Sequence, residues 1–381
     1  MSSDNKHPDV VIIGGGVMGM SAAYHLARRG AKVTLLEAEQ FFGTGSTALN
    51  AGGFRHQFST GVNIELSKLS LSMLQRFEEE FEQPVAYNPC GYLFLLSSDK
   101  DVAAFQSNVA VQHAHGVMTR WLSPKEIAEL APQVNLDGII GATFYERDGL
   151  VDPNGVLQGY VRGASRAGAA LRSGVRVTGA RVNGGVIEAL HTTAGDISGG
   201  QYLLAAGPWS GQVGRLLGID MPVVPIRRQI AVTAPIAGLT RAFPFVIDFA
   251  QSLYFHYEGG AILTGMSNHA EQPGFDTTVD EAWREVHVAA AMERVPMLAE
   301  SAIAHEWAGL YEVTPDDQAI IGKLPQLENL YACTGFSGHG LMHGPAAGLA
   351  ISEEILDGAA HTVDIAPLRW REFGAGEYNV V

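Results

Sequence analysis

The feature that most constrains the fold is a G-x-G-x-x-G motif at residues 14–19, which lies between a short apolar run and an amphipathic segment. The run at residues 9–13 suits a buried parallel strand, and residues 21–29 have the apolar spacing of a helix. A second apolar run follows at residues 31–36 and leads into Glu37. This order predicts a βαβ unit whose glycine turn can bind the phosphates of a dinucleotide.

Each glycine of the motif has a separate physical role. Gly14 allows the tight turn, Gly16 lets a pyrophosphate approach the backbone at the positive end of the helix dipole, and Gly19 lets helix and strand pack closely. Glu37 stands 18 residues after Gly19, where a carboxylate can accept both ribose hydroxyls. Because an acid there repels a 2′-phosphate, the motif favours NAD or FAD over NADP.

Composition excludes several classes of protein. The chain has 381 residues, of which 46% are hydrophobic and 17% charged, which is typical of a globular protein of more than one domain. The net charge of −15 disfavours nucleic-acid binding. Two cysteines are too few for a cysteine-based zinc site, and no apolar run is long enough to span a membrane. We expect a cytoplasmic protein without a metal site.

NAD and FAD both use such a motif, and three later stretches favour FAD. Residues 43–47 (GTGST) offer small and hydroxyl side chains to an extended dinucleotide. Residues 205–207 (AAG) close an apolar run at a turn that can pass close to a cofactor. Residues 335–340 (GFSGHG) open the last predicted helix, where backbone N–H groups can face the polarised carbonyl of a reduced flavin.

The sequence resembles the flavin-dependent amino acid oxidase family, which contains sarcosine oxidase, glycine oxidase and D-amino acid oxidase. Within it, the sequence is most similar to the sarcosine oxidase beta-subunits and the archaeal L-proline dehydrogenase beta-subunits. The stretches that carry the resemblance span nearly the whole chain in the family's order, and they are VVIIGGGVMG, GSTALNAGGFRHQF, GYLFLL, AAGPWS, WAGLYEVTPDDQAIIG and GFSGHGLMHGPAAG.

The resemblance implies an α/β fold: a Rossmann-like FAD-binding domain with an inserted α+β substrate domain that carries a mixed or antiparallel sheet. On this basis we assign residues 1–85, 146–222 and 315–381 to the FAD-binding domain. Residues 86–145 and 223–314 are assigned to the substrate domain. A second strand–glycine–helix unit near the C-terminus agrees with a nucleotide domain that is divided in the sequence.

The resemblance also implies which residues contact FAD. Family members that attach flavin covalently use positions that are Gly309 and Asn50 here, so we expect non-covalent FAD. The expected cofactor residues are Gly14, Gly16, Val17, Met18, Gly19, Glu37, Gly45, Ser46, Thr47, Asn50, Ala51, Gly52, Gly53, Val177, Ala206, Gly207, Trp209, Gly335, Gly338, His339, Gly340, Leu341 and Met342.

Members of this family take a hydride from the carbon next to an amine nitrogen, and the resulting imine is hydrolysed. A substrate carboxylate is best held by an arginine, whose planar fork matches its two oxygens. Arg55 directly follows the expected flavin loop and is the leading candidate, with Arg227 and Arg228 as second choices. The other expected substrate-site residues are Tyr254, His256, Tyr311, His339 and Met342.

Departures from the family pattern affect the expected activity. Met342 stands where monomeric sarcosine oxidase has a carboxylate-binding lysine, and Tyr311 replaces an arginine of glycine and D-amino acid oxidases. Leu263 occupies the position of a lysine that promotes reaction with oxygen in sarcosine oxidases. The resemblance therefore implies an oxidase or dehydrogenase for a secondary or N-alkylated amino acid, similar to sarcosine or proline.

Two other functions remain open from the sequence. The same fold oxidises 2-hydroxy acids or glycerol phosphate, which requires a base, and His256 or His339 would have to serve. The chain could also be the flavin subunit of a larger amine dehydrogenase complex with an electron-transfer partner. A homo-oligomer is the other assembly that the resemblance allows.

Overall fold

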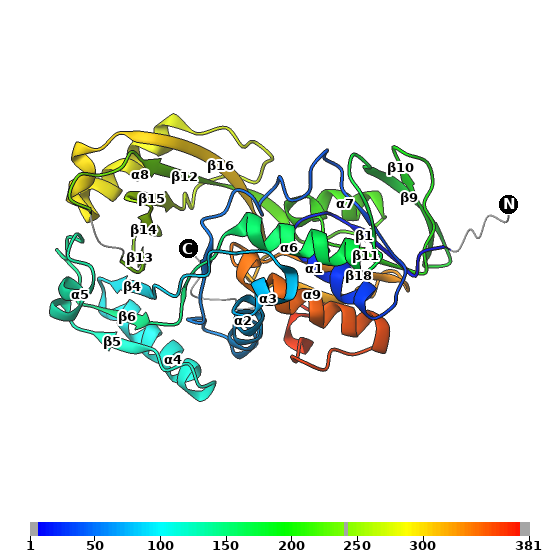
Figure 1. Cartoon of the computed structure of the whole chain (residues 1–381), viewed down its shortest axis with the longest axis horizontal. Coiled ribbons are helices and arrows are strands. Elements are labelled where there is room, and N and C mark those ends of the chain that lie inside the picture. Colours follow the sequence, from blue (N-terminus) through cyan, green and yellow to red (C-terminus); the bar gives the residue numbers. More distant parts are fainter. Residues whose placement is uncertain (1–6, 240–242, 374–381) are drawn as a thin grey trace.

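Two β-sheets dominate the architecture, and they lie at opposite ends of the long axis of the molecule (Figure 1). The computed structural model describes residues 7–239 and 243–373, within which one sheet has six strands and the other has eight. The long strands β12 (Val224–Thr233) and β16 (Ile303–Val313) belong to the eight-stranded sheet and extend from it toward the six-stranded sheet.

The six-stranded sheet contains the βαβ unit expected at the start of the chain. Its order is β17-β18-β11-β1-β2-β8, and all neighbours are parallel except β17 and β18. Both faces are covered, so β1 places Val10 and Ile12 in one core and Val11 and Ile13 in another. The strands are β1 (Val10–Ile13), β2 (Val33–Leu36), β8 (Ala170–Arg172), β11 (Gln201–Leu204), β17 (Ile320–Lys323) and β18 (Leu330–Thr334).

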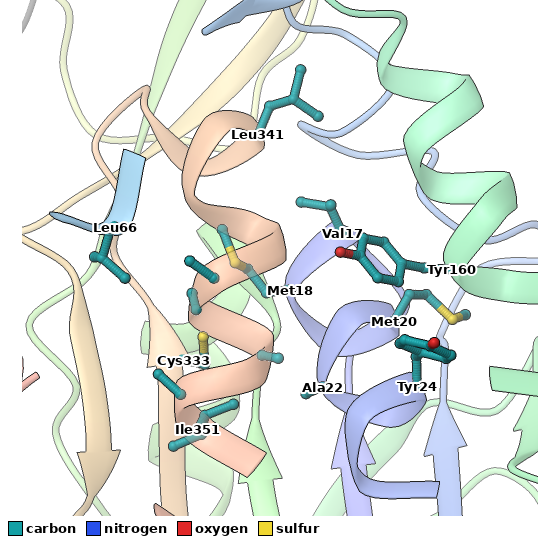
Figure 2. Close-up of a cluster of buried hydrophobic side chains, with 14 of the residues drawn as sticks. Val17, Met18, Met20, Ala22, Tyr24, Leu66, Tyr160, Cys333, Leu341 and Ile351 are labelled. Atoms are coloured by element: carbon teal, nitrogen blue, oxygen red, sulfur yellow. The ribbon is translucent and has the colours of Figure 1, made fainter. Parts of the chain in front are cut away.

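Helices cover one face of this sheet. Helix α1 (Val17–Arg28) packs against both α6 (Pro153–Arg166) and α9 (Gly340–Asp357). Figure 2 shows the apolar side chains that fill this layer, with Tyr24 of α1 and Tyr160 of α6 on one side of α1. Helices α2 (Gly61–Leu74) and α3 (Phe77–Phe81) complete the layer, α2 against α9 and α3 against α6.

The opposite face is covered by a hairpin and a short helix. The hairpin consists of β9 (Val177–Asn183) and β10 (Val186–Thr192), and the helix is α7 (Ser210–Leu216). Side chains from the hairpin and from the segment after α7 form a common core with alternate residues of β1 and β11. A 3-10 turn, η1 (Gly207–Trp209), joins β11 to α7 and contacts both β12 and β16.

The first and last helices approach the sheet and each other at glycines. A Cβ on Gly19 would overlap the carbonyl oxygen of Gly14, and a Cβ on Gly348 would overlap Ser21. Gly14 also has a φ of +115°, which side chains rarely adopt. Helix α1 therefore packs closely on the glycine turn at Gly19 and on α9 at Ser21, and larger residues at Gly19 or Gly348 would push α1 away from the sheet or from α9.

The eight-stranded sheet is mixed. Its order is β16-β12-β15-β14-β13-β4-β6-β5, and only β13 and β4 form a parallel pair. Helices α4 (Asp99–Ala114), α5 (Pro124–Leu130) and α8 (Glu281–Arg294) belong to this half. The remaining strands are β4 (Tyr92–Leu96), β5 (Arg120–Leu122), β6 (Gly141–Tyr145), β13 (Phe245–Asp248), β14 (Leu253–Glu258) and β15 (Ala261–Met266).

Short elements connect the two halves. Strands β3 (Gly53–Phe54) and β7 (Gly149–Leu150) form a small antiparallel pair. Two further 3-10 turns are η2 (Pro296–Glu300), which packs on α8, and η3 (Ala366–Leu368), which packs on β17.

The expected fold class is confirmed. The strands of the six-stranded sheet all lie in residues 1–85, 146–222 and 315–381, and those of the eight-stranded sheet lie in residues 86–145 and 223–314. The exact domain boundaries stay a prediction, because nothing in the structure marks a residue at which one unit ends. The spacing of Ser123 and Glu126 in the sequence is typical of a capping box, and the structure has one there at the start of α5.

The apolar patterns of residues 63–82 and 152–170 each predict one continuous helix, and both predictions are wrong in extent. The helix predicted over residues 63–82 is broken after α2, because Phe77 and Phe81 turn to pack on Tyr160. The helix predicted over residues 152–170 ends at Arg166, and a glycine with a φ of +94° leads the chain into β8. At the first break tertiary packing overrides a continuous helical pattern, and at the second a glycine ends the helix locally.

The structure also bears on two features of the composition, the cysteines and the possible membrane spans. Cys90 and Cys333 are both free thiols, and Cys333 is buried. No helix in the described parts of the chain has the length and apolar character needed to cross a membrane.

The glycine contact predicts a stability effect. Gly19→Ala places a methyl group on the carbonyl oxygen of Gly14, and we expect it to lower the free energy of unfolding by about 1–3 kcal/mol or more. Gly274→Ala is the control, since its Cβ would have no neighbour closer than 3.9 Å. Thermal denaturation of both variants measures the effect, and equal melting temperatures would contradict the close approach.

Candidate cofactor and substrate site

One elongated cavity of about 590 Å³ extends from the carboxyl ends of β1, β2 and β11 to the inner strands of the eight-stranded sheet. Pockets for small ligands and cofactors usually have about 300–1,000 Å³. Twenty of the expected cofactor residues line it, and they are Gly14, Gly16, Val17, Met18, Glu37, Gly45, Ser46, Thr47, Asn50, Ala51, Gly53, Val177, Ala206, Gly207, Trp209, Gly338, His339, Gly340, Leu341 and Met342.

Three expected cofactor residues do not line the cavity. Gly19 faces the glycine turn, as described above. Gly52 has a φ of +74°, and a Cβ there would lie 2.6 Å from the carbonyl oxygen of Val151. Gly335 has a φ of +81° and donates its N–H to the Glu312 carboxylate. These glycines shape the loops around the cavity rather than its surface.

At one end of the cavity the carboxylate of Glu37 is fixed at the end of β2. It accepts the N–H of Gly15 at 2.8 Å with one oxygen and the N–H of Glu39 at 2.8 Å with the other. Glu39 in turn pairs with Arg176, which also lines this end. The carboxylate therefore faces a polar recess, as the binding of ribose hydroxyls requires.

The N-terminus of α1 opens on the middle of the cavity. The first turn of α1 contains no acidic residue. Its capping residue is Gly16, which has no side chain that could accept a hydrogen bond from the N–H groups of this turn. The N–H of Val17 donates to the hydroxyl of Thr47 at 3.1 Å. A helix N-terminus with a positive dipole end and no acid of its own is a suitable site for an anion.

Residues 43–53 form a loop that is held by its own hydrogen bonds. The hydroxyl of Ser46 donates to the carbonyl of Leu310, and the amide of Asn50 donates to the carbonyl of Thr47. The N–H of Gly52 donates to the Asn50 side chain at 2.7 Å. The side chains of Ser46 and Asn50 thus position the loop, and the loop backbone forms the wall of the cavity.

A second helix N-terminus, that of α9, reaches the cavity at its other end. No acidic residue lies in its first turn, and the side chain of His339 does not cap it. The preceding loop is held by the buried carboxylate of Glu312, which accepts the hydroxyl of Thr334 and the N–H of Gly335, both at 2.8 Å. Burial raises the pKa of Glu312, and these hydrogen bonds oppose the rise.

The His339 side chain faces this end without a protein partner. Its ring is 1% exposed, and neither ring nitrogen has a hydrogen-bond partner among the described residues. Burial, together with His343 and Arg55, holds the pKa of His339 well below its usual value. A neutral imidazole with unused donor and acceptor atoms that lines a cavity is suited to bind a ligand.

Aromatic rings form the wall of this end. Tyr92 and Phe245 stack with centroids 4.2 Å apart, and Phe245 stacks with Tyr254 at 5.6 Å. Tyr311 lies beside Gly338 of the final loop, where a Cβ would overlap its ring. Burial raises the pKa values of Tyr92, Tyr254 and Tyr311, so their hydroxyls are neutral donors.

Arg55 enters this aromatic end from the loop side. Its side chain is 6% exposed, its guanidinium lies 4.2 Å from the Phe58 ring centroid, and it donates to the carbonyl of Gln57. The following residues are anchored by Asp148, which accepts the backbone N–H of His56 at 2.7 Å and the side-chain amide of Gln57 at 3.1 Å. The segment is therefore rigid where the arginine leaves it.

The other candidate substrate residues differ in whether they line the cavity. Arg228 and Met342 line the cavity, whereas Arg227 does not and forms ion pairs at the surface of β12. His256 is not among the residues that line the cavity, so its expected role at the substrate stays a prediction without support from the cavity lining. It is fully buried further along β14, and its ring packs on Phe245 with the centroids 5.1 Å apart.

Sequence reasoning missed several residues of this end. Tyr92 and Phe245 are on β4 and β13, whose strands read from the sequence as ordinary core. Glu312 and Asp148 are buried acids, and their positions in the sequence carry no motif that separates them from surface acids. For Glu312, only its place inside the family-like stretch WAGLYEVTPDD gave a signal.

The residues present fit a flavin dinucleotide. The cavity connects a ribose-binding carboxylate, one helix N-terminus for a pyrophosphate and a second helix N-terminus beside a pocket of aromatic side chains. The unpartnered ring nitrogens of His339 lie at that second end. A mononucleotide would leave one of the two helix N-termini without an anion or a polarised carbonyl.

A family model described as "FAD dependent oxidoreductase" (DAO) matches residues 9–354. The chain belongs to this family. The match covers every element that lines the cavity, from β1 to α9. FAD is therefore the cofactor, and the resemblance noted from the sequence is confirmed.

Individual relatives span the whole chain. It is 30% identical to "FAD-dependent oxidoreductase domain-containing protein 1" of Bos taurus, over 98% of this chain and 86% of that protein. It is 28% identical to mitochondrial dimethylglycine dehydrogenase of Rattus norvegicus, over 97% of this chain but only 46% of that longer protein. The chain thus spans about half of the dehydrogenase.

A solved structure extends the comparison to the fold. L-proline dehydrogenase from P. horikoshii superimposes with a TM-score of 0.87 and 31% sequence identity, over 93% of this chain and 95% of that one. The protein is therefore an FAD-dependent oxidoreductase with the architecture of this family.

Burial of His256 predicts a pH dependence of stability. Burial lowers its pKa from 6.5 to about 4, so the unfolded chain binds a proton between these values that the folded chain does not. The contribution to stability is full above pH 6.5 and falls by about 1.4 kcal/mol per pH unit as the pH drops toward 4. We expect His256→Gln to flatten the fall in melting temperature between pH 6.5 and 4.5.

The control for this measurement is His7, at the exposed start of the described chain. His7→Gln should leave the pH profile of the melting temperature as in the wild type. A His256→Gln profile that is parallel to the wild-type profile would show that this histidine is protonated in the folded protein.

Proposed function

We propose that the protein oxidises the C–N bond of a secondary or N-alkylated amino acid, of the sarcosine or proline type, to an imine that is then hydrolysed. The observation that carries the proposal is the position of Arg55, a buried arginine in an aromatic cavity end beside the loop that opens α9. The names of two relatives, dimethylglycine dehydrogenase and L-proline dehydrogenase, support the substrate class.

FAD, when bound, accepts the hydride from the carbon next to the nitrogen. The chain has to hold the two reactants and to exclude water. In this proposal Glu37 and the N-terminus of α1 would hold the adenosine and pyrophosphate, and the N-terminus of α9 with His339 would lie beside the ring system. The helix dipole of α9 favours negative charge at its N-terminus, where a reduced ring carries it.

The substrate end supplies orientation and charge. In this proposal the fork of Arg55 holds the carboxylate, and the rings of Tyr92, Phe245 and Tyr254 form a dry wall beside the reacting carbon. A buried guanidinium also disfavours a second positive charge nearby, so it shifts the substrate amine toward its neutral form. Only the neutral amine has the lone pair that drives hydride departure.

The hydroxy-acid alternative lacks support at the site. Oxidation of an alcohol carbon requires a base for the hydroxyl proton, and His256 lies away from the cavity. His339 is at the cavity, but burial lowers its pKa well below 6.5, which makes it a weak base. Amine oxidation needs no such base, because the neutral amine already carries its lone pair.

The position of Leu263 bears on the electron acceptor. It is buried on β15, away from the cavity, and no lysine lines the cavity among the described residues. In sarcosine oxidases a lysine beside the ring promotes reaction with oxygen by stabilising superoxide. In this cavity the positive charges are those of arginines, and we assign Arg55 to the substrate carboxylate rather than to oxygen. We therefore propose a dehydrogenase that passes electrons to a partner protein or a quinone.

Anaerobic flavin bleaching tests the function. The purified protein is mixed with sarcosine, L- and D-proline, other N-methyl amino acids, primary amino acids and 2-hydroxy acids. We expect rapid bleaching by at least one secondary amino acid and slow return of the colour in air. Bleaching by hydroxy acids alone would overturn the proposal. Bleaching by none of the compounds would also overturn it and would favour the alternative of a flavin subunit that is inactive without its partner.

The role of Arg55 makes a further prediction. Arg55→Gln keeps a hydrogen-bonding side chain but removes the charge, and we expect KM for the substrate to rise by about 10- to 100-fold. The flavin spectrum should show that FAD remains bound. Unchanged kinetics would remove Arg55 from the substrate site. Arg227→Gln is the control, because Arg227 is outside the cavity and pairs with surface acids.

A further inference from the structure

A second arginine lines the substrate end of the cavity. Arg228 lies on β12, and its guanidinium carbon is 5.1 Å from the ring centroid of Tyr311. Arg55 and Arg228 both act electrostatically on the Tyr311 hydroxyl, so this tyrosine lies within reach of both guanidinium groups. The end of the cavity that receives the substrate therefore carries two positive charges.

The two neighbouring arginines of β12 have opposite surroundings. Arg227 pairs with Glu271 and Asp276 at 3.1 Å and with Asp280 at 3.4 Å. Arg228 forms no ion pair within the described residues, and it donates only to the carbonyl of Arg227, at 3.0 Å. The difference follows from strand geometry, since successive residues of β12 face opposite sides of the sheet.

The Arg228 side chain has unused hydrogen-bonding capacity. Its Nε is buried and has no partner among the described residues. Burial lowers the pKa of Arg228, and Tyr311 and Tyr254, with smaller effects from Glu271 and Asp317, oppose the shift only in part. A buried guanidinium without a counter-charge is costly, and an anionic ligand would remove that cost.

The acids that line the cavity are engaged elsewhere. Glu312 is bound to the loop before α9 through Thr334 and Gly335. Glu37 and Glu39 lie at the ribose end.

Glu271 and Asp317 act on Arg228 electrostatically but form no ion pair with it in the described parts of the chain, and Glu271 is paired with Arg227. An anion in direct contact with Arg228 inside the cavity would therefore come from the ligand.

From this arrangement we propose that the substrate is a dicarboxylic secondary amino acid, with one carboxylate on Arg55 and the second on Arg228. This inference rests on the proposed amine oxidation and adds the chemical class of the substrate. The second carboxylate belongs either to the N-substituent, as in iminodiacetate, or to the side chain, as in N-methylaspartate. Both compounds carry two carboxylates and one secondary amine.

Matched substrate pairs test the proposal by kcat/KM. Iminodiacetate is compared with N-isobutylglycine, and N-methyl-L-aspartate with N-methyl-L-leucine. The members of each pair have similar size and differ mainly in the second carboxylate. We expect the dicarboxylate of at least one pair to be favoured by about tenfold or more. A monocarboxylate that matches or exceeds its partner in both pairs would overturn the proposal.

Variants of the two adjacent arginines identify the residue responsible. Arg228→Gln should reduce the dicarboxylate preference by about 10- to 100-fold, and Arg228→Lys should retain part of it. Arg227→Gln should keep the wild-type preference, since that side chain is outside the cavity. If Arg228→Gln lowers kcat/KM equally for both members of a pair, its role is structural and the proposal fails.

Binding of unreactive analogues provides a measurement without turnover. Thiodiacetate and (methylthio)acetate contain sulfur in place of nitrogen, so they cannot be oxidised at a C–N bond. Their Kd values are read from changes in the flavin absorbance spectrum. We expect thiodiacetate to bind more tightly to the wild type and to lose this advantage in Arg228→Gln.

The two proposals can fail separately. If no amino acid bleaches the flavin, the proposed function fails, while tight thiodiacetate binding that depends on Arg228 still supports a dianion site. If secondary amino acids bleach the flavin but thiodiacetate binds no better than (methylthio)acetate, amine oxidation stands and the dicarboxylate inference is wrong.

Discussion

The contact between the backbones of the first and last helices determines where everything else in the site lies. Gly19 meets the turn at Gly14, and Gly348 meets Ser21, so α1 and α9 approach the sheet and each other more closely than side chains would allow. Both helix N-termini then open on the same cavity. Two positive dipole ends on one elongated space are what a long dinucleotide with two anionic or polarised regions requires.

The sequence predicts the cofactor half of the site well and the substrate half poorly, and the reason is physical. Binding of ribose and pyrophosphate depends on local features, a glycine turn and an acid at the end of the next strand, whose spacing is visible in one short stretch. The substrate end combines Tyr92, Arg228 and Tyr254 from three strands far apart in the sequence. Only the pairing register of the sheet brings such residues together.

Two adjacent cases illustrate this limit. Arg227 and Arg228 are equivalent in the sequence, but strand alternation points one at surface acids and the other at the cavity. Tyr254 and His256 share a face of β14, yet only Tyr254 lines the cavity. The strand continues past the edge of the cavity before it reaches His256. The break in the helix near Phe77 also depends on a long-range contact, the packing of Phe77 on Tyr160 of α6, which the helical pattern of the sequence does not show.

The arrangement of α9 has a consequence for biosynthesis. The ribose end of the cavity is formed by β1, β2, α1 and residues 175–177, all in the first half of the chain, whereas the other end needs residues 335–342 and the helix that they open. That helix also covers the apolar faces of α1 and α2. A nascent chain that stops before it therefore exposes a hydrophobic surface and lacks one wall of the cavity. Stable binding of the whole FAD molecule therefore indicates that the nascent chain has been synthesised as far as α9.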